Sequence, residues 1–278
     1  MGSGPSRIGR VLARAAIAGV LALCIAHAAP GDRARLLEGA AASKLSPAEL
    51  ADEPPGYLAP GVLDLASIVS PPPAPDSPQD QADVAALKLA THAAPARWAR
   101  ALADDASVYD RFEKEFGLTL ERHRLPRLIR VLNRASADVL AAGAQAKKLY
   151  PRPRPFQRFA LARVCGQAVP PKPDASPTTG TSYPSGHAAL GWATVLVLIE
   201  IAPSHAQQLL LRAEDYGQSR VVCGVHFPSD VEASRKLAGA LVDRLLTVPE
   251  FRRDVACAKI EHRAVLAGEL SENLPACQ

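Results

Sequence analysis

Three short runs of polar residues set the main condition on how this chain folds. They are a Lys-x6-Arg-Pro run at residues 147–155, a Pro-Ser-Gly-His run at 184–187 and a Ser-Arg-x5-His-x3-Asp run at 219–230. Together their defining residues supply three cations, two histidines and a carboxylate. Such a set can hold a phosphate-like oxyanion and break it by nucleophilic attack without a metal. A fold that serves this chemistry has to bring the three runs together.

The sequence around these runs is typical of helices. Of the 278 residues, 48% are hydrophobic but only 5% are aromatic, and alanine and leucine dominate, which favours helices over a β-sandwich. No alternating strand pattern, internal repeat or glycine-rich phosphate loop appears. We therefore predict an all-α fold, a single helical-bundle domain. Helices are expected at about 78–92, 95–104, 106–116, 119–148, 186–201, 204–222, 229–246 and 249–268.

Residues 1–28 are expected to be a cleaved signal peptide. Three arginines precede an apolar run at 15–25, and Ala-His-Ala at 26–28 fits a small-x-small cleavage site. The run is about eleven residues long, whereas ~20 are needed to span a bilayer. A short membrane anchor or a disordered tail is the alternative. Without its three arginines the formal charge of +4 falls to about +1, which argues against a nucleic-acid partner.

Prolines divide the rest of the chain. They exclude helix interiors from much of residues 29–78, so this segment is expected to pack on or flank a helical domain at 79–278.

The most apolar later segment, residues 188–202, is about fifteen residues long and contains Glu200, which indicates a buried core helix rather than a membrane span. We therefore expect no stable membrane insertion.

Four cysteines lie beyond the signal peptide. In an oxidising compartment this even count favours two disulfides, for which three pairings exist, and free buried thiols are the alternative. Cys165 and Cys223 both flank residues of the polar runs, so a bridge between them would hold the site together. Cys257 and Cys277 would then tie down the C-terminal tail.

The Pro-Ser-Gly-His run has the features of an anion site. Ser185 is a good N-cap, Gly186 permits close backbone approach, and an apolar helix follows at once. Free N–H groups and the helix dipole favour an anion at such a start. His187 in the first turn would face that anion. Taken alone, the run could equally be a capping motif with an incidental histidine.

The third run predicts a histidine with a carboxylate partner. Ser229 and Glu232 are expected to form a capping box, with Asp230 at the first helical position. His226 precedes this helix, so Asp230 can reach one imidazole nitrogen and leave the other with a free lone pair, as a nucleophile needs. Without this context a histidine that helps to cap a helix would be the better interpretation.

Lys147, Arg154 and Arg220 are the candidate anion-binding cations. Buried together, they would repel one another unless an anion lay between them. Arginine matches phosphate oxygens bidentately, and lysine adds a point charge. Three neighbours compete on charge alone and are expected to form a solvated basic loop: Lys148, Arg152 and Arg158.

The order and spacing of the three runs resemble the signature of the type 2 phosphatidic acid phosphatase (PAP2) superfamily. Its relatives include bacterial class A non-specific acid phosphatases and vanadium haloperoxidases. Residues 182–187, Gly191-Trp192, residues 219–226 and the proline-rich stretch before Ser77 look most like class A enzymes. The resemblance covers about residues 55–265, and it implies the all-α fold of that superfamily.

The resemblance also implies a role for each residue. His226 would attack phosphorus to give a phosphohistidine, with Asp230 orienting it, and His187 would protonate the leaving oxygen and then activate water. One histidine must be neutral and the other protonated, so mildly acidic pH is expected to favour activity. No metal or other cofactor is implied. The phosphate oxygens would be bound by Lys147, Arg154, Arg220, Ser185 and the Gly186 backbone N–H.

The function expected from the sequence is a periplasmic, metal-independent acid phosphatase with broad specificity for small phosphate monoesters, inhibited by vanadate. The alternatives are a vanadate-dependent haloperoxidase, whose known members are generally much longer, a phosphotransferase, and a non-catalytic phosphate-binding protein. Retention of both histidines argues against the last. Ala188 and Phe227-Pro228 depart from the class A pattern, so the substrate preference stays open. The oligomeric state is open as well, and a homo-oligomer is one of the alternatives.

Overall fold

The computed structural model describes residues 55–166 and 181–277. Within these ranges the regular structure is helical and contains no β-strand, so the predicted all-α class is confirmed. The predicted signal peptide and the proline-rich segment up to residue 54 lie outside the described residues. The proposed domain boundaries stay a prediction.

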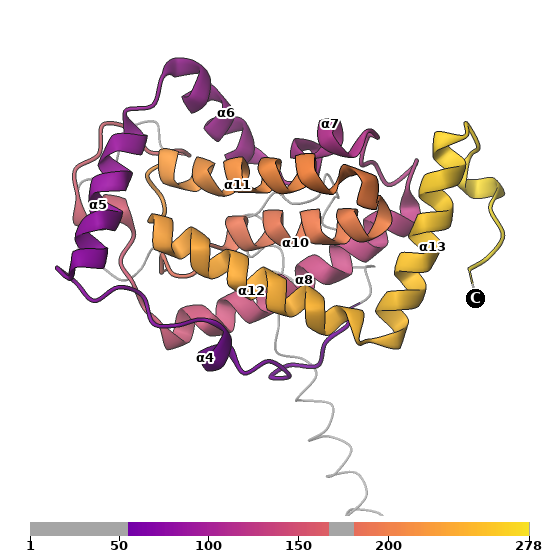
Figure 1. Ribbon diagram of the computed structural model, residues 1–278, viewed down its shortest axis with the longest axis horizontal. Coiled ribbons are helices and arrows are strands. Elements are labelled where there is room, and N and C mark those ends of the chain that lie inside the picture. Colours follow the sequence, from indigo (N-terminus) through magenta and orange to yellow (C-terminus); the bar gives the residue numbers. More distant parts are fainter. Residues whose placement is uncertain (1–54, 167–180, 278) are drawn as a thin grey trace, which may run out of the picture. The chain divides into compact units, whose positions relative to one another are not determined.

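Figure 1 shows the arrangement of the helices. The longer ones are α5 (Pro78–Thr91), α6 (Pro95–Ala106), α8 (Pro126–Leu149), α10 (Gly186–Ile201), α11 (Ala206–Val222), α12 (Pro228–Leu246) and α13 (Pro249–Leu266). The short ones are α4 (Leu65–Ile68), η1 (Tyr109–Arg111), α7 (Glu113–Phe116), α9 (Pro155–Arg158), η3 (Pro203–His205) and η4 (Ser271–Asn273).

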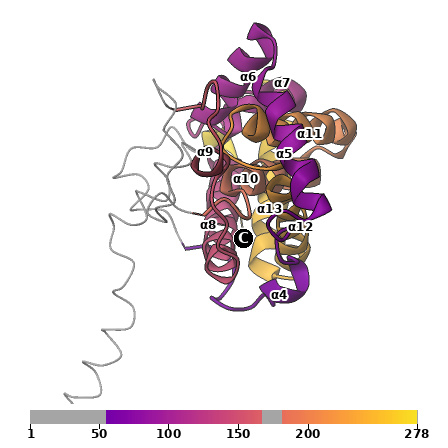
Figure 2. The same cartoon turned by 90° about the vertical axis from the view of Figure 1, so that its left-hand side faces the viewer.

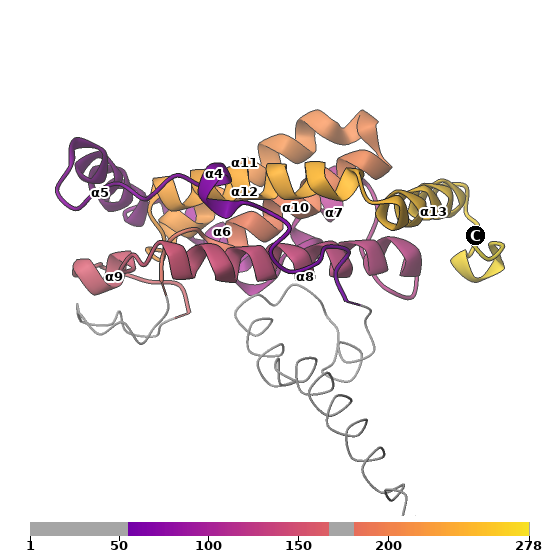
Figure 3. The ribbon, with the colours of Figure 1, turned by 90° about the horizontal axis from the view of Figure 1, so that it is seen from below.

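Helix α10 forms the centre of the core. It is apolar nearly all round, and such a helix is stable only when other elements cover every side. It packs against α8, α11 and α12, and α8 runs along one side of this group (Figures 1 and 3). The prediction of a buried core helix here is confirmed. In the described part of the chain, no helix is long and apolar enough to cross a membrane.

Helices α10 and α11 approach closely because Gly191 faces an aromatic ring. A Cβ atom at Gly191 would lie 2.5 Å from Cδ1 of Tyr216, a distance that real side chains do not adopt. Tyr216 is fully buried, and its hydroxyl donates to the Ser107 carbonyl at 3.1 Å. The glycine therefore sets the spacing between α10, whose first turn carries His187, and α11, whose last turn carries Arg220.

Two expected helices were wrong in extent. Residues 107–116 form loops with η1 and α7, because Ser107 is extended at φ −159° and interrupts the chain after α6. The helix expected from residue 119 starts only at Pro126. A proline is tolerated in the first turn but not in the interior of a helix, where it removes a hydrogen bond and clashes with the preceding turn.

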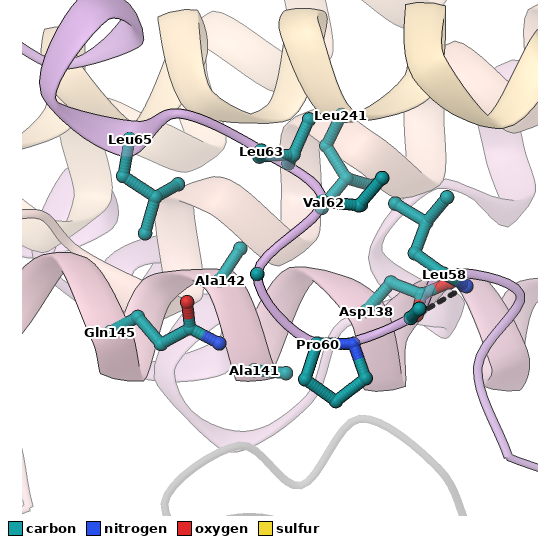
Figure 4. Close-up of a pocket in the computed structure, with 12 residues that line it drawn as sticks. Leu58, Pro60, Val62, Leu63, Leu65, Asp138, Ala141, Ala142, Gln145 and Leu241 are labelled. Atoms are coloured by element: carbon teal, nitrogen blue, oxygen red, sulfur yellow. Dashed lines mark hydrogen bonds between the residues drawn. The ribbon is translucent and has the colours of Figure 1, made fainter.

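Residues 55–65 run along α8 and α12 (Figure 4). Asp138 of α8 accepts hydrogen bonds from the backbone N–H groups of Tyr57 at 2.8 Å and Leu58 at 3.2 Å. The Tyr57 ring lies under the Arg134 guanidinium, 3.7 Å from its carbon. Beside these contacts, the segment lines a small, mainly apolar cavity of about 60 Å³ together with Ala142 of α8 and Leu241 of α12. This segment is thus held to the helices by specific polar contacts.

Two disulfides are formed, Cys165–Cys223 and Cys257–Cys277. The Cys165 N–H also donates to the Cys223 carbonyl at 3.0 Å. The first bridge therefore ties residues 161–166 to the end of α11, three residues beyond Arg220. The second joins α13 to the last described residue.

Candidate active site

The three polar runs meet where several helices begin or end, close to α5. Lys147 is in the last turn of α8, Arg154 is the N-cap of α9, and Arg220 is in the last turn of α11. His187 lies in the first turn of α10, and His226 lies in the turn between α11 and α12. Figure 2 looks toward this end of the helices.

The start of α10 is built as the sequence predicts. The Ser185 hydroxyl accepts the Ala188 N–H at 3.4 Å, and Gly186 is the first helical residue with no atom close to where its Cβ would be. The Ser185 N–H donates to the Asp230 carbonyl at 3.2 Å. The starts of α10 and α12 are therefore linked directly through their backbones.

Lys147 and Arg154 lie in a poorly solvated environment. Lys147 Nζ donates to the carbonyls of Thr181 and Pro184 at 2.7 and 2.6 Å. Burial and the nearby Arg154 guanidinium lower the pKa of Lys147 to about 7. Burial and Arg220 lower the pKa of Arg154 to about 10. Both groups thus hold their charge under repulsion, which a bound anion would relieve.

Arg220 is 3% exposed, and its Nη1 donates to Asp105 Oδ1 at 2.6 Å. Its Nε is buried and has no hydrogen-bond partner in the part of the chain that the structure describes. Among the described residues, Arg220 is the only one of the three cations with a carboxylate at ion-pair distance. An unpaired buried donor is costly unless a ligand satisfies it, so this guanidinium is a candidate ligand-binding group.

The surroundings of both histidines favour the neutral imidazole. Burial and then Arg220 hold the pKa of His187 well below 6.5, and a hydrogen bond to the Asp105 backbone acts in the opposite direction. Burial and then Arg154 do the same to His226. The charge of a bound oxyanion would favour protonation of either ring. A ligand and a proton are therefore expected to bind together.

The contacts of His226 define its tautomer. Arg154 Nη1 lies 3.3 Å from Nε2 of His226, and a guanidinium can only donate, so Nε2 carries the lone pair. Nδ1 then carries the proton. It lies 3.3 Å from Ser182 Oγ and 3.5 Å from Asp230 Oδ2. The predicted pairing of His226 with Asp230 is present, and a hydroxyl that the sequence spacing did not single out contacts both side chains.

The predicted capping box at α12 was wrong. Phe227 is the N-cap and Pro228 the first helical residue, so Asp230 lies at the third position, where its Oδ2 accepts the Phe227 N–H at 2.8 Å. Glu232 pairs with Arg235 instead, and the Ser229 hydroxyl contacts Asp83. Pro228 explains the shift, because proline is favoured at the first position of a helix.

Arg152 was also wrongly assigned to a solvated loop. It is 5% exposed and donates to Asp230 at 2.7 Å, and also to Asp83 at 2.9 Å and to Asp80 at 3.1 Å. Arg158 joins the same group by donating to Asp80 at 2.7 Å. Of the three neighbours, only Lys148 is exposed. The sequence reasoning missed Arg152 because its partners come from distant helices.

The donor set suits an oxyanion better than a metal ion. Within residues 55–166 and 181–277, no group of three His, Cys, Asp or Glu side chains is placed to hold a metal ion. The groups that surround the two histidines are instead cations and the N–H groups at the start of α10. These are the groups that bind phosphate in proteins.

Residues 131–253, which include all three polar runs, match the family model described as the PAP2 superfamily. A non-specific acid phosphatase of Providencia stuartii is 37% identical over 155 residues, 55% of this chain and 60% of that protein. An acid phosphatase of Zymomonas mobilis is 34% identical over 169 residues, 59% of this chain and 62% of that protein. A non-specific acid phosphatase of Salmonella typhimurium is 42% identical over 120 residues, 43% of this chain and 46% of that protein. The chain thus spans less than two thirds of these relatives.

Proposed function

We propose that this chain is a member of the PAP2 superfamily and a metal-independent acid phosphatase acting on phosphate monoesters. The observation that carries the proposal is the convergence of Lys147, Arg154 and Arg220 on two histidines, with Arg220 Nε lacking a partner among the described residues. A dianionic phosphate group would neutralise these cations and satisfy the free donor. The names of the relatives agree with this activity.

In the proposed complex, the phosphate oxygens bind the three cations, and the Ser185 and Gly186 segment at the start of α10 supplies further donors. These groups are fixed by the fold before substrate arrives: Lys147 by two carbonyls, and Arg220 by Asp105. Donors that need no rearrangement stabilise the charge on the transferring phosphoryl group most effectively.

In the first step, His226 Nε2 attacks phosphorus and the bond to the ester oxygen breaks. Arg154 keeps the lone pair on Nε2, and Ser182 and Asp230 face the Nδ1–H. His187 gives its proton to the leaving oxygen, which departs as an alcohol. The dianionic substrate supplies the charge that raises the pKa of His187 and lets it carry this proton at mildly acidic pH.

In the second step, His187, now neutral, removes a proton from water, and the resulting hydroxide attacks the phosphohistidine. The bond from phosphorus to Nε2 breaks, inorganic phosphate leaves, and His226 returns to its neutral form. An alcohol in place of water would give a transferase reaction by the same route.

Broad specificity and a periplasmic location are further parts of the proposal. All the proposed binding groups engage the phosphate and none engages the rest of the ester, which supports a wide range of monoesters. The expected signal peptide and the two disulfides support export, because disulfides form in oxidising compartments.

The test is hydrolysis of p-nitrophenyl phosphate by the purified protein at a pH of about 5 to 6 with EDTA present. We expect turnover, inhibition by vanadate, and loss of turnover in His226→Ala. Full activity in His226→Ala would exclude the proposed nucleophile. Oxidation of bromide with vanadate and peroxide, without phosphatase activity, would instead identify a haloperoxidase.

A further inference from the structure

The Ser182 hydroxyl contacts both the proposed nucleophile and its carboxylate. The side chain of Ser182 is fully buried, and its Oγ is 2.5 Å from Asp230 Oδ2 and 3.3 Å from His226 Nδ1. The direct distance from Asp230 Oδ2 to Nδ1 is 3.5 Å, slightly longer than the contact of Nδ1 with Ser182 Oγ. The Ser182 hydroxyl is therefore closer to Nδ1 than the carboxylate is, and it also contacts the carboxylate itself.

The direction of each of these hydrogen bonds follows from the donors available. Asp230 accepts from Arg152 on one oxygen and from the Phe227 N–H on the other, so it acts as an ionised acceptor. The Ser182 hydroxyl must therefore donate to Asp230. The proton on His226 Nδ1, required by the contact of Arg154 with Nε2, then donates to a lone pair of Ser182 Oγ.

We propose that Ser182 is a positioning residue that transmits the charge of Asp230 to His226 through the chain Nδ1–H to Oγ–H to carboxylate. The inference rests on the proposed function and names how its nucleophile is oriented. When Nε2 bonds to phosphorus, the ring becomes a cation, and the polarised hydroxyl stabilises the positive charge at Nδ1–H. No proton needs to cross the path, because each donor keeps its hydrogen.

Ser182 also has a purely structural contact, which the test must separate from this role. Its N–H donates to the Arg152 carbonyl at 2.7 Å and holds residues 181–185 beside the segment that leads to α9. A hydrogen bond to the Ser182 backbone also favours the charged form of His226. Both backbone contacts remain when only the hydroxyl is removed, so Ser182→Ala isolates the hydroxyl.

In Ser182→Ala we expect kcat for p-nitrophenyl phosphate to fall by roughly 10-fold, the factor that a net hydrogen-bond contribution of about 1.4 kcal/mol gives. KM is expected to stay unchanged, because Lys147 and Arg154 are untouched. The acid limb of the kcat/KM profile should move to lower pH, since the variant loses a contact that favours protonated His226. Ser182→Thr, which keeps a hydroxyl, should recover part of kcat.

The matched control is Ser136→Ala. Ser136 is a buried serine whose hydroxyl contacts Tyr109 in the core, at 3.1 Å, so this variant should keep both the kcat and the pH profile. In the double variant of Ser182→Ala and Asp230→Asn, kcat should equal that of Asp230→Asn alone, because both changes cut one path. If the kcat of the double variant instead fell by the product of the two single-variant factors, the proposal would be overturned.

A readout without turnover separates this proposal from the proposed function. In ¹⁵N-labelled protein, the His226 Nδ1 proton resonance, identified by its loss in His226→Ala, should shift in Ser182→Ala and not in Ser136→Ala. An unchanged resonance in Ser182→Ala would overturn the role of Ser182. A shifted resonance in a protein with no phosphatase activity would overturn the proposed function and leave the hydrogen-bonded path standing.

Discussion

Arg152 donates to Asp230 Oδ1 at 2.7 Å, and both side chains are almost completely buried. The same guanidinium contacts Asp80 and Asp83 of α5, and its carbon lies 4.1 Å from the centre of the Phe227 ring. Helix α5 thus takes part in holding the carboxylate that faces the proposed nucleophile, although none of its residues contacts the imidazole in these interactions.

Arg152→Ala should both destabilise the protein and lower its activity. Removing one partner of a buried ionic cluster leaves uncompensated charges and costs about 3 to 5 kcal/mol. Asp230 would also lose the group that holds it, so kcat should fall. Urea unfolding and kinetics on the same preparation would measure both effects. Lys148→Ala, at an exposed neighbour, should change stability by less than about 0.5 kcal/mol. Equal stability of the two variants would contradict the role of the cluster.

The pH dependence of substrate capture should reflect Lys147. Its pKa is lowered to about 7, so the lysine is charged below that pH and loses its charge as the pH rises through it. We expect kcat/KM to fall above about pH 7, because the free enzyme then lacks one anion-binding charge. Lys147→Arg keeps the charge, and its kcat/KM should fall less steeply over this range. The same slope in both proteins would show that another group controls the limb.

Replacing two helix-interior glycines by alanine should change the stability of the protein in opposite directions. Gly191→Ala introduces a Cβ 2.5 Å from the Tyr216 ring, and such overpacking typically costs about 1 to 3 kcal/mol. At Gly239 of α12 nothing lies within 4 Å of the new Cβ, so Gly239→Ala should stabilise the protein by about 0.5 to 1 kcal/mol. Thermal unfolding of both variants checks the pair, and a stabilising Gly191→Ala would show that α10 and α11 can separate freely.

The two disulfides should differ in their effect on activity. Each closes a loop, with separations of 58 and 20 residues, and its loss should cost about 3 to 4 kcal/mol by the loop-entropy relation. Only Cys165–Cys223 is adjacent to the turn that carries His226. Replacing Cys165 and Cys223 by serine should therefore raise KM, whereas replacing Cys257 and Cys277 should leave KM unchanged. An unchanged KM in both double variants would contradict this assignment.

The sequence was informative at two helix starts that carry a clear local signal. The starts of α5 and α10 were predicted from Ser77 and Ser185, whose side chains cap the helices as expected. Pro126 is a further local signal for the start of α8, because proline is excluded from helix interiors.

Contacts between distant segments were the part that could not be predicted. Ser182 is one of several serines near the Pro-Ser-Gly-His run, and nothing in its spacing marks it as a neighbour of Asp230. Arg152 looked solvated because its three carboxylates come from α5 and α12, at separations of 69 to 78 residues. Periodicity and caps describe single helices and carry no information on which side chains meet.

The long sequence separations between Arg152 and its carboxylate partners also affect the order in which parts of the protein fold. Contacts between distant residues form only after the chain has lost the entropy of closing the long loops between them. The Arg152 cluster joins α5, the segment before α9 and α12, so Asp230 is oriented only when all three are docked. During refolding, helical content should therefore recover before turnover does, and the return of activity would mark completion of the fold.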